Sequence, residues 1–323
     1  MKFSIGLPVY KARFLRECID SILAQTYNDF ELIIVNDASP ENIDEIINQY
    51  SDNRIFYFLN TENIGAENVV LNWNKCLEFA TGDYFVCMGD DDLLHPNYLQ
   101  SFFDLINKFP DVNVFHCRTL IIDEKSEIIS VTPLSPERES LYNYLVTFIK
   151  RERQQFLGDF VYYRKELLKV GGFYPLPLGW ASDYLTSFIL SKEKGIAYTS
   201  NPVFFYRINR YNITSTSPIE LKRLAVMELI RWMNKLKDNN TVLFSEYEKY
   251  EYTILANCMD GFNTNERSAF ITQYIGSGIK IINIFKLIRL REKFDVKLID
   301  IFSACACVWF AKLPYLLKIF MKN

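Results

Sequence analysis

Tyr-Phe-Val-Cys-Met-Gly-Asp-Asp-Asp, residues 84–92, is a run of five apolar residues followed by glycine and three consecutive aspartates. Short continuous apolar runs of this kind are typical of strands that are covered on both faces of a sheet. Similar runs precede it in the chain at residues 3–9, 30–35 and 55–59. Between them, apolar residues recur at helical spacing over residues 14–23 and from about 66 to 80. Strands that alternate with helices predict an α/β fold with a mostly parallel sheet.

Polar clusters follow three of these predicted strands. Pro8-Val9-Tyr10 ends the first strand, Asn36-Asp37-Ala38-Ser39 ends the second, and the aspartates at 90–92 end the fourth. In open α/β sheets, ligands bind beyond the carboxyl ends of the strands. We therefore expect one binding site to be built from these three clusters.

The three adjacent aspartates, Asp90, Asp91 and Asp92, repel one another unless a cation or hydrogen-bond donors compensate them. Carboxylate oxygens suit Mg²⁺ or Mn²⁺. Because Mg²⁺ is usually held by one or two carboxylates together with substrate phosphates, the cluster predicts a substrate with a nucleoside diphosphate. Taken in isolation, the same tripeptide would also fit a solvated acidic turn or the start of a helix.

The composition excludes several classes of protein. Hydrophobic residues make up 49% of the 323 residues, which is ample for a buried core and excludes a fibrous or disordered chain. The net charge of -3 supplies no general attraction for nucleic acid, so we expect no such partner. The seven cysteines are odd in number and do not suit a secreted disulfide framework. No signal-like run opens the chain, and we expect a cytoplasmic protein.

The second half of the chain is predicted to change character near residue 217. Further strands are expected at 112–117, 156–163 and 197–206. A helix is expected from Asp183 to about residue 193, and the polar segment 123–140 is expected to be a surface excursion. From Pro218 onward the pattern is helical. We predict an N-terminal domain of residues 1–217 and a helical region of residues 218–323.

The C-terminal tail, residues 280–323, is basic. It holds nine Lys or Arg and three Asp or Glu, interleaved with aromatic and aliphatic residues. This composition predicts peripheral contact with the anionic inner face of a cytoplasmic membrane. A packed helical cap with a solvated basic face, or a surface for protein partners, would have the same composition.

Four spaced motifs occur in order along the first part of the chain. They are Pro8-Val9-Tyr10, Ser-Ile-Leu-Ala-Gln-Thr-Tyr at 21–27, Glu-Leu-Ile-Ile-Val-Asn-Asp-Ala-Ser at 31–39, and Gly82-Asp83-Tyr84 before the aspartates. Over about residues 2 to 215 this set resembles the family-two glycosyltransferases of the GT-A fold. The resemblance implies a Rossmann-like, mostly parallel sheet flanked by helices, with the C-terminal helices as an extension. It also implies an inverting, metal-dependent transfer of sugar from a nucleotide-sugar.

The resemblance assigns the nucleotide to the ends of the first two strands. Pro8 and Tyr10 match the turn that contacts the nucleotide, where an aromatic ring can stack on a base. Asp37 matches the acid that pairs with the base edge, and Ser39 accompanies it. For a uridine nucleotide, the carboxylate of Asp37 would accept the N3 hydrogen of uracil. As structural alternatives, Pro8 and Tyr10 would form a strand-end turn, and Asp37 and Ser39 an Asx-type turn and helix cap.

The resemblance assigns the acid cluster to the ribose and the metal ion. Asp90 looks like the residue that faces the ribose, and Asp91 and Asp92 look like ligands of Mg²⁺ or Mn²⁺. Gly89 stands where the family's commonest pattern has its first acid. Which of the three aspartates contacts the metal is therefore left open.

The resemblance also supplies candidates for the acceptor side. Asp183 matches the catalytic base, although Ser182 replaces the usual Glu; the alternative is a helix N-cap. Trp180 would stack on an acceptor sugar or fill a gap in the core. Arg207 matches a loop residue that contacts the diphosphate. Asn209 stands where many relatives carry His, so we expect no second metal contact there.

The reaction implied is transfer from a UDP-sugar to a hydroxyl of a glycan or a lipid-linked acceptor in surface polysaccharide synthesis. Two alternatives stay open. One is a relative that binds sugar-nucleotide or carbohydrate without turnover, and the other is a nucleotidyltransferase, which also combines acids, metal and nucleotide in an α/β fold. The sequence does not identify the donor sugar, the acceptor, the linkage or the oligomeric state, because pocket specificity arises only on folding.

Overall fold

The computed structural model describes residues 1–212, 216–238, 246–277 and 280–310, with side chains as far as residue 305. The chain forms two compact units. The first comprises Met1–Thr216 and Leu243–Leu255, and the second comprises Ser217–Val242 and Ala256–Asn323. Whether residues 1–217 fold as an independent domain stays a prediction.

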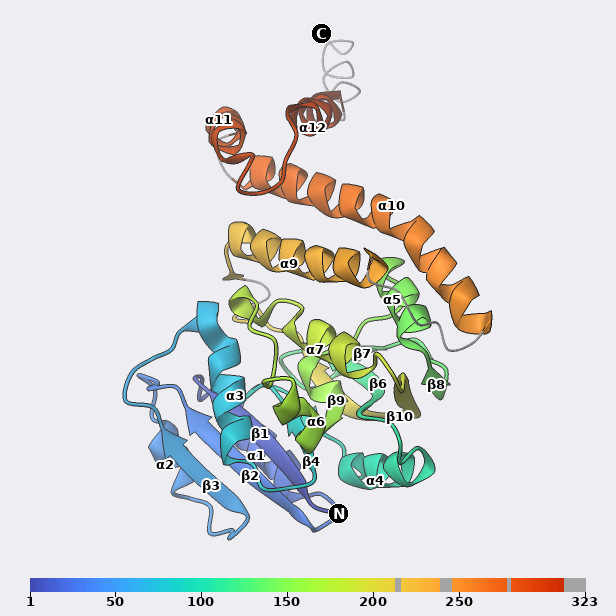
Figure 1. Ribbon diagram of the computed structural model, residues 1–323. Helices are drawn as coiled ribbons and strands as arrows, with labels where there is room; N and C mark the ends of the chain where they lie inside the picture. Colours follow the sequence, from blue (N-terminus) through green and yellow to red (C-terminus); the bar gives the residue numbers. More distant parts are fainter. Residues whose placement is uncertain (213–215, 239–245, 278–279, 311–323) are drawn as a thin grey trace. The chain divides into compact units, whose positions relative to one another are not determined.

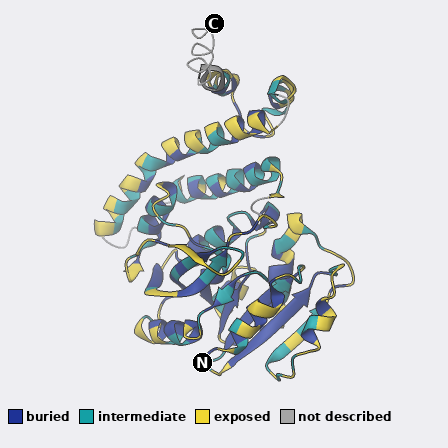
Figure 2. Cartoon of the chain, turned by 180° about the vertical axis from the view of Figure 1, so that it is seen from behind, coloured by how far each residue is buried: buried dark blue, intermediate teal, exposed yellow. Residues whose placement is uncertain are grey.

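The first four strands form the parallel half of the sheet in the first unit. They are β1 (Phe3–Val9), β2 (Phe30–Asn36), β3 (Ile55–Leu59) and β4 (Tyr84–Cys87). Their order is β3-β2-β1-β4, and each neighbouring pair is parallel. Figure 1 shows β1, β2 and β3 side by side, and Figure 2 shows the buried strands in dark blue. The predicted strands at the start of the chain are thus confirmed.

Helices cover both faces of this parallel half. Alternate residues of β1, from Phe3 to Val9, pack in one core cluster with α1 (Leu15–Leu23) and α2 (Ile43–Ile47). On the other face lie η1 (Ala66–Asn68) and α3 (Val69–Phe79). A Cβ at Gly6 would lie 2.7 Å from Cβ of Cys76 in α3 and 2.6 Å from the ring of Phe85. Only glycine allows this close approach of helix and strand.

The second half of the sheet is mixed. The order continues β4-β9-β6-β10-β5, where β9 is antiparallel to both β4 and β6, and β6 is parallel to β10. The remaining elements of the first unit, before residue 216, have the bounds β5 (Leu93–Leu94), α4 (Tyr98–Lys108), β6 (Val114–Ile122), β7 (Ile128–Val131), β8 (Arg138–Glu139), α5 (Leu141–Ile149), η2 (Leu157–Asp159), β9 (Phe160–Tyr163), α6 (Arg164–Lys169), η3 (Pro177–Gly179), α7 (Ser182–Leu190) and β10 (Ile196–Arg207). Parallel pairing therefore holds for β1 to β4 and for β6 with β10, and helices flank the sheet as predicted.

The segment 123–140 is more ordered than a plain surface excursion. It turns back as β7, which pairs antiparallel with β6, and ends in β8, which pairs with β10. All four residues of β7 are exposed. The strand is short and its neighbours in sequence are mostly polar, so the sequence pattern did not indicate it. The next helix, α5, is capped by the side chain of Ser140, which accepts from the backbone N–H of Asn143 at 3.1 Å.

The described part of the second unit is helical, as the sequence predicts after Pro218. Its helices are α9 (Ile219–Asp238), α10 (Glu246–Gly276), whose first residues belong to the first unit, α11 (Lys280–Leu290) and α12 (Leu298–Phe310). Phe270, Tyr274, Leu287, Phe294 and Ile301 are among the residues that form its core. Among the described helices, none combines the length and the apolar character needed to cross a membrane.

Candidate active site

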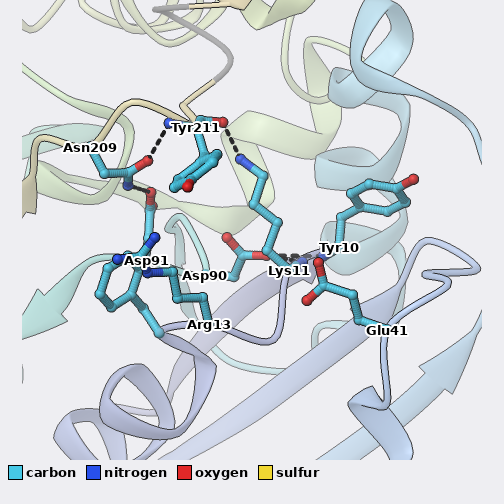
Figure 3. Close-up of a pocket in the computed structure, with 9 residues that line it drawn as sticks. Tyr10, Lys11, Arg13, Glu41, Asp90, Asp91, Asn209 and Tyr211 are labelled. Carbon is cyan, nitrogen blue, oxygen red and sulfur yellow. Dashed lines mark hydrogen bonds between the residues drawn. The ribbon is translucent and has the colours of Figure 1, made fainter. Parts of the chain in front are cut away.

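A cavity of about 360 Å³ lies beyond the carboxyl ends of β1 and β4, in the first unit. It is lined by residues from the loops that follow β1, β2, β4 and β10, namely Tyr10, Lys11, Arg13, Phe14, Glu41, Asp90, Asp91, Asn209 and Tyr211. Figure 3 shows their side chains around the cavity. Tyr10, Asp90 and Asp91 belong to the predicted site, and the structure brings these three together.

The pairing of β1 with β4 places the loop after β1 beside the aspartates. Gly6 of β1 lies opposite Cys87 of β4, so both strands end at the same edge of the sheet. The carboxylate of Asp90 then accepts the backbone N–H groups of Tyr10 and Lys11, each at 2.9 Å. Asp90 is therefore fixed against the loop that the sequence assigned to the nucleotide.

The loop after β10 closes the other side of the cavity. The side-chain amide of Asn209 donates to Oδ2 of Asp91 at 2.7 Å, and its Oδ1 accepts the N–H of Tyr211 at 2.8 Å. Nζ of Lys11 donates to the backbone carbonyl of Tyr211. Arg13 lies with its guanidinium 5.2 Å from the centre of the Tyr211 ring. Two loops far apart in sequence are thus tied across the cavity (Figure 3).

Burial dominates the electrostatics of the three aspartates. Burial, reinforced by the negative charge of Asp91, raises the pKa of Asp90 to about 6, although hydrogen bonds from the backbone act in the opposite direction. Burial also raises the pKa of Asp91, against the hydrogen bond from Asn209 and the charge of Lys11. The pKa of Asp92 is raised well above its ordinary value for the same reason. Three buried carboxylates of this kind favour a bound cation.

Gly89 lies close to two carboxylate oxygens. A Cβ at this position would lie 2.9 Å from Oδ1 of Asp91 and 3.1 Å from Oδ2 of Asp92. A side chain at position 89 would therefore press on both carboxylates. Within the described residues, no group of three or more His, Cys, Asp or Glu could hold a metal ion by itself. The donor set fits a cation that shares two carboxylates with phosphate or water, which is the usual situation of Mg²⁺.

The predicted nucleotide residues Pro8 and Ser39 lie next to Tyr10. Pro8 is the penultimate residue of β1. The hydroxyl of Ser39 donates to the backbone carbonyl of Tyr10 at 2.6 Å and accepts the N–H of Glu41 at 3.1 Å. The side chain of Tyr10 is 44% exposed, so its ring is accessible to a planar ligand. Ser39 thus holds the loop, and direct contact of Pro8, Tyr10 and Ser39 with a nucleotide stays a prediction.

Asp37 is buried, and its carboxylate organises the loop before α3. Oδ1 accepts from the side chain of Asn60 at 2.8 Å and from the N–H of Ile64 at 2.9 Å. Oδ2 accepts from the side chain of Asn63 at 3.2 Å and from the N–H of Gly65 at 3.3 Å. A carboxylate offers about four acceptor positions. Pairing with a base edge would require exchange of one of these bonds, and it stays a prediction.

Arg207 is held within the fold by hydrogen bonds, and its contact with a diphosphate stays a prediction. Its side chain is fully buried and does not line the cavity. The guanidinium donates to the backbone carbonyl of Asp91 at 2.8 Å, to Glu17 at 2.9 Å and to Ser126 at 2.9 Å. Its backbone N–H donates to Oδ1 of Asp92 at 2.9 Å. In this structure Arg207 therefore supports the acid loop, because its donors are already used there.

Asp183 and Trp180 lie outside the lining of this cavity. Asp183 is in the first turn of α7, two residues after Ala181, which has a positive φ of 63°. Its Oδ1 accepts the N–H of Tyr184 at 2.9 Å. Burial raises the pKa of Asp183 to about 6, which makes it a stronger base than an ordinary aspartate. Trp180 is partly buried at the end of η3. Their roles toward an acceptor stay predictions.

Sequence reasoning missed five residues of the lining. Lys11 and Arg13 lie one and three positions after Tyr10, and Phe14 follows them. Lys11 brings positive charge to Asp90 and Asp91, whereas Arg13 pairs with Glu124 at 2.7 Å. Glu41 accepts the N–H of Ala12 at 2.6 Å and shapes the same loop. Tyr211 arrives from the loop after β10. Basic residues immediately after a predicted strand that ends at a binding edge were a signal available in the sequence.

Comparison with known proteins agrees with this geometry. The family "Glycosyl transferase family 2" matches residues 4–172, which is more than half of the chain. The chain belongs to this family and has a GT-A fold.

Individual relatives match over shorter stretches. An uncharacterized glycosyltransferase of Rickettsia typhi is 38% identical over 125 residues, which is 38% of this chain and 38% of the relative. The putative glycosyltransferase EpsE of Bacillus subtilis is 34% identical over 127 residues, which is 38% of this chain and 45% of the relative. Each of these matches spans less than half of the relative's own length.

Two solved structures share the fold at low sequence identity. The structure of TarS 1-349 from S. aureus in complex with UDP-GlcNAc has a TM-score of 0.63 and 16% identity, and the match covers 84% of this chain and 81% of that chain. The mannosyltransferase PcManGT from Pyrobaculum calidifontis, in complex with GDP-Man and Mn²⁺, has a TM-score of 0.52 and 15% identity, with coverage of 95% and 87%.

Proposed function

We propose that this chain is a metal-dependent, inverting glycosyltransferase, and that it moves a sugar from a UDP-sugar to a hydroxyl of a glycan or lipid-linked acceptor in surface polysaccharide synthesis. The observation that carries the proposal is the cavity at the ends of β1 and β4, where Asp90 and Asp91 lie near the charge of Lys11. The combination of buried acids and nearby cations suits a diphosphate held together with a cation. TarS in complex with UDP-GlcNAc supports a uridine nucleotide.

The residues of this chain have separable roles in the proposed donor complex. Asp91 and Asp92 would hold Mg²⁺ or Mn²⁺ through the oxygens that face Gly89, and such an ion supplies positive charge that stabilises a leaving diphosphate. PcManGT in complex with GDP-Man and Mn²⁺ supports this choice of ion. Lys11 adds a second positive charge from the opposite loop. Asp90, fixed by two backbone N–H groups, is oriented to accept from ribose hydroxyls.

Asp183 is the proposed base. It takes the proton of the acceptor hydroxyl while the acceptor oxygen bonds to the anomeric carbon, and the bond from that carbon to the diphosphate oxygen breaks with its electrons on the diphosphate. Attack on the face opposite the leaving group inverts the configuration. The pKa of about 6 keeps Asp183 unprotonated at neutral pH and basic enough for this step. We place the reaction in the cytoplasm, which the six free thiols in the described part of the chain support.

A thermal-shift panel tests the donor and the metal together. The intact chain is heated with UDP-sugars, GDP-mannose and CMP-linked sugar, each with and without Mn²⁺. We expect UDP-sugars to raise the melting temperature only with Mn²⁺, because saturation at about 100 times the dissociation constant adds roughly 2.7 kcal/mol of stability. Asp91→Asn should remove this shift, and Asp104→Asn, on the exposed surface of α4, should retain it. Metal-independent shifts, or none with any nucleotide-sugar, would overturn the proposal.

Product analysis separates the alternatives. Release of UDP with glycosylation of an acceptor supports the proposed transfer. Release of pyrophosphate would identify a nucleotidyltransferase instead. Metal-dependent binding without turnover of any glycan or lipid-linked acceptor would point to a relative that binds the donor only.

A further inference from the structure

One side of α11 exposes large apolar side chains. Ile281, Ile282 and Phe285 are 61%, 46% and 68% exposed, and Lys286 and Arg289 are exposed on the same helix. Their positions repeat at intervals of three and four residues, so they form one stripe along the helix. Leu287, on the other side, is fully buried in the core of the second unit. The exposed stripe is therefore a surface of a folded, anchored helix.

The next helix, α12, repeats this arrangement. Leu298, Ile299 and Phe302 are 43%, 67% and 62% exposed, again at the spacing of one helix face. Ile301 of the same helix is fully buried in the same core as Leu287. Two helices that share a core thus each present large apolar residues to solvent. Concentrations of this kind mark an interaction surface more often than isolated exposed residues do.

The acids of this region are neutralised from within the second unit. Asp295 lies 4.0 Å from Arg223 and 3.7 Å from Arg267, and Asp300 lies 3.1 Å from Arg267. Glu292 lies 3.2 Å from Arg291. These three are the acids between residues 280 and 300. Their charges therefore do not offset the other cations nearby.

Five cations stay without a carboxylate partner. Among the described residues, no Asp or Glu lies within 4.0 Å of the charged nitrogens of Lys280, Lys286, Arg289, Lys293 and Lys297. Helix α11 itself contains no acid. On α11, Lys286 and Arg289 therefore give the exposed apolar stripe a positive charge that no acid of the same helix offsets.

We infer that the basic apolar face, defined as the exposed apolar residues of α11 and α12 with these five cations, docks on an anionic lipid surface. Apolar side chains would enter the boundary between headgroups and acyl chains, and the long cationic side chains would reach the headgroup phosphates. A second copy of this chain fits less well, because two identical positive faces would repel each other. The described helices are not suited to cross a membrane, so the contact is peripheral. This inference does not depend on the proposed reaction.

Vesicle co-sedimentation of the intact chain tests the face. We expect binding to mixed vesicles of phosphatidylcholine and phosphatidylglycerol, much weaker binding to phosphatidylcholine alone, and a loss of binding as salt is raised. The charge variant Lys286→Glu/Arg289→Glu should weaken binding at least about tenfold, since each basic residue near an anionic surface contributes about a fivefold factor. The apolar variant Phe285→Ser/Phe302→Ser should also weaken binding at least about tenfold, because binding scales with the apolar area that enters the membrane.

Matched controls come from exposed positions in the first unit. Ile128→Ser/Ile129→Ser removes apolar side chains that are 62% and 57% exposed, and Lys165→Glu/Lys192→Glu reverses two exposed cations. Both should bind vesicles like the unaltered chain. Circular dichroism and donor-induced thermal shifts should be the same for all variants, which excludes misfolding.

Three outcomes would overturn the inference. They are absence of binding to anionic vesicles by the unaltered chain, undiminished binding by both face variants, and equal losses in the controls. Light scattering in the absence of lipid adds a fourth. A dimer of the unaltered chain that the face variants dissociate, together with no vesicle binding, would assign the face to a second copy.

Discussion

The side-chain amide of Asn209 donates a hydrogen bond of 2.7 Å to Oδ2 of Asp91, and the two residues are 118 positions apart in sequence. The bond joins the loop after β10 to the acid loop after β4. It uses Oδ2 of Asp91, while Oδ1 lies beside Gly89, 2.9 Å from where a Cβ would stand. Asn209 therefore orients the carboxylate of Asp91.

Replacement of Asn209 by alanine tests this orienting function. Loss of a partner that fixes a metal-binding carboxylate typically lowers metal affinity by about 10–100-fold. We expect Asn209→Ala to raise the Mn²⁺ concentration needed for half-maximal donor binding by at least about tenfold, with a small change in melting temperature. Titration of Mn²⁺ in the presence of UDP-sugar measures the effect. Asn201→Ala, at an exposed position in β10, is the control, and equal behaviour of the two variants would contradict the assignment.

Gly89 gives a second test of the same site. A methyl group at this position would lie 2.9 Å from Oδ1 of Asp91 and 3.1 Å from Oδ2 of Asp92, closer than ordinary contact, and would push on both carboxylates. We expect Gly89→Ala to lower metal-dependent donor binding by about tenfold or more, because the carboxylates must move apart. Gly261→Ala, at a position in α10 where a Cβ meets no atom within 4 Å, should change nothing. Unchanged Mn²⁺ dependence of Gly89→Ala would place the cation elsewhere.

The first four strands could be predicted from sequence because each is a continuous apolar run, and β1, β2 and β4 are buried along almost their whole length. β3 lies at the edge of the sheet and exposes Phe56 and Leu59. β7 could not be predicted in this way, since all its residues are exposed and its strand conformation depends on pairing with β6. Local pattern reports burial well, and it reports pairing with distant strands poorly.

The candidate site divides in the same way. Tyr10, Asp90 and Asp91 were predictable because they lie at the ends of adjacent parallel strands. The partners of Arg207 could not be predicted, because its guanidinium binds Glu17 and Ser126 from segments that only folding brings together. A charged residue in a loop sequence gives no indication of whether its donors are free or used within the fold.

Glu31 should make the stability of the fold sensitive to acid. Its carboxylate is buried, and accepts from Nζ of Lys2 at 2.5 Å, from the hydroxyl of Ser4 at 2.6 Å and from the N–H of Thr81 at 2.6 Å. Burial alone would raise its pKa, but these hydrogen bonds outweigh burial and lower the pKa of Glu31 from 4.5 to about 2. The folded chain therefore binds the proton more weakly than the unfolded chain does. The stabilisation is present above pH 4.5 and is lost as the pH falls toward 2.

Urea unfolding at a series of pH values checks this prediction. We expect the free energy of unfolding to fall by about 1–3 kcal/mol more in the unaltered chain than in Glu31→Gln between neutral pH and pH 3. Glu45→Gln, at an exposed position in α2, should follow the unaltered chain. If Glu31→Gln and the unaltered chain lose stability in parallel, Glu31 does not connect β1 to β2 through its charge.

Asp183 should set the lower limb of the pH profile of turnover. Burial raises its pKa from 3.8 to about 6, and a base acts only when it is unprotonated. We expect kcat to rise as the pH passes 6 and to level off above it. Asp183→Asn should abolish turnover and leave the metal-dependent affinity for the donor intact, because Asp183 lies outside the cavity that holds the predicted donor contacts.

The same substitution should stabilise the fold, which distinguishes a catalytic base from a helix cap. A carboxylate with a raised pKa costs stability once it is charged, so its contribution declines as the pH rises from about 4 to about 6. The asparagine side chain would keep an oxygen that can accept the N–H of Tyr184 and would carry no charge, so Asp183→Asn should gain about 1–3 kcal/mol above pH 6. Asp104→Asn should gain nothing. Full turnover by Asp183→Asn would reject the assignment of Asp183 as the base. Lost turnover together with a higher free energy of unfolding is expected of a buried catalytic residue that lowers the stability of the folded chain.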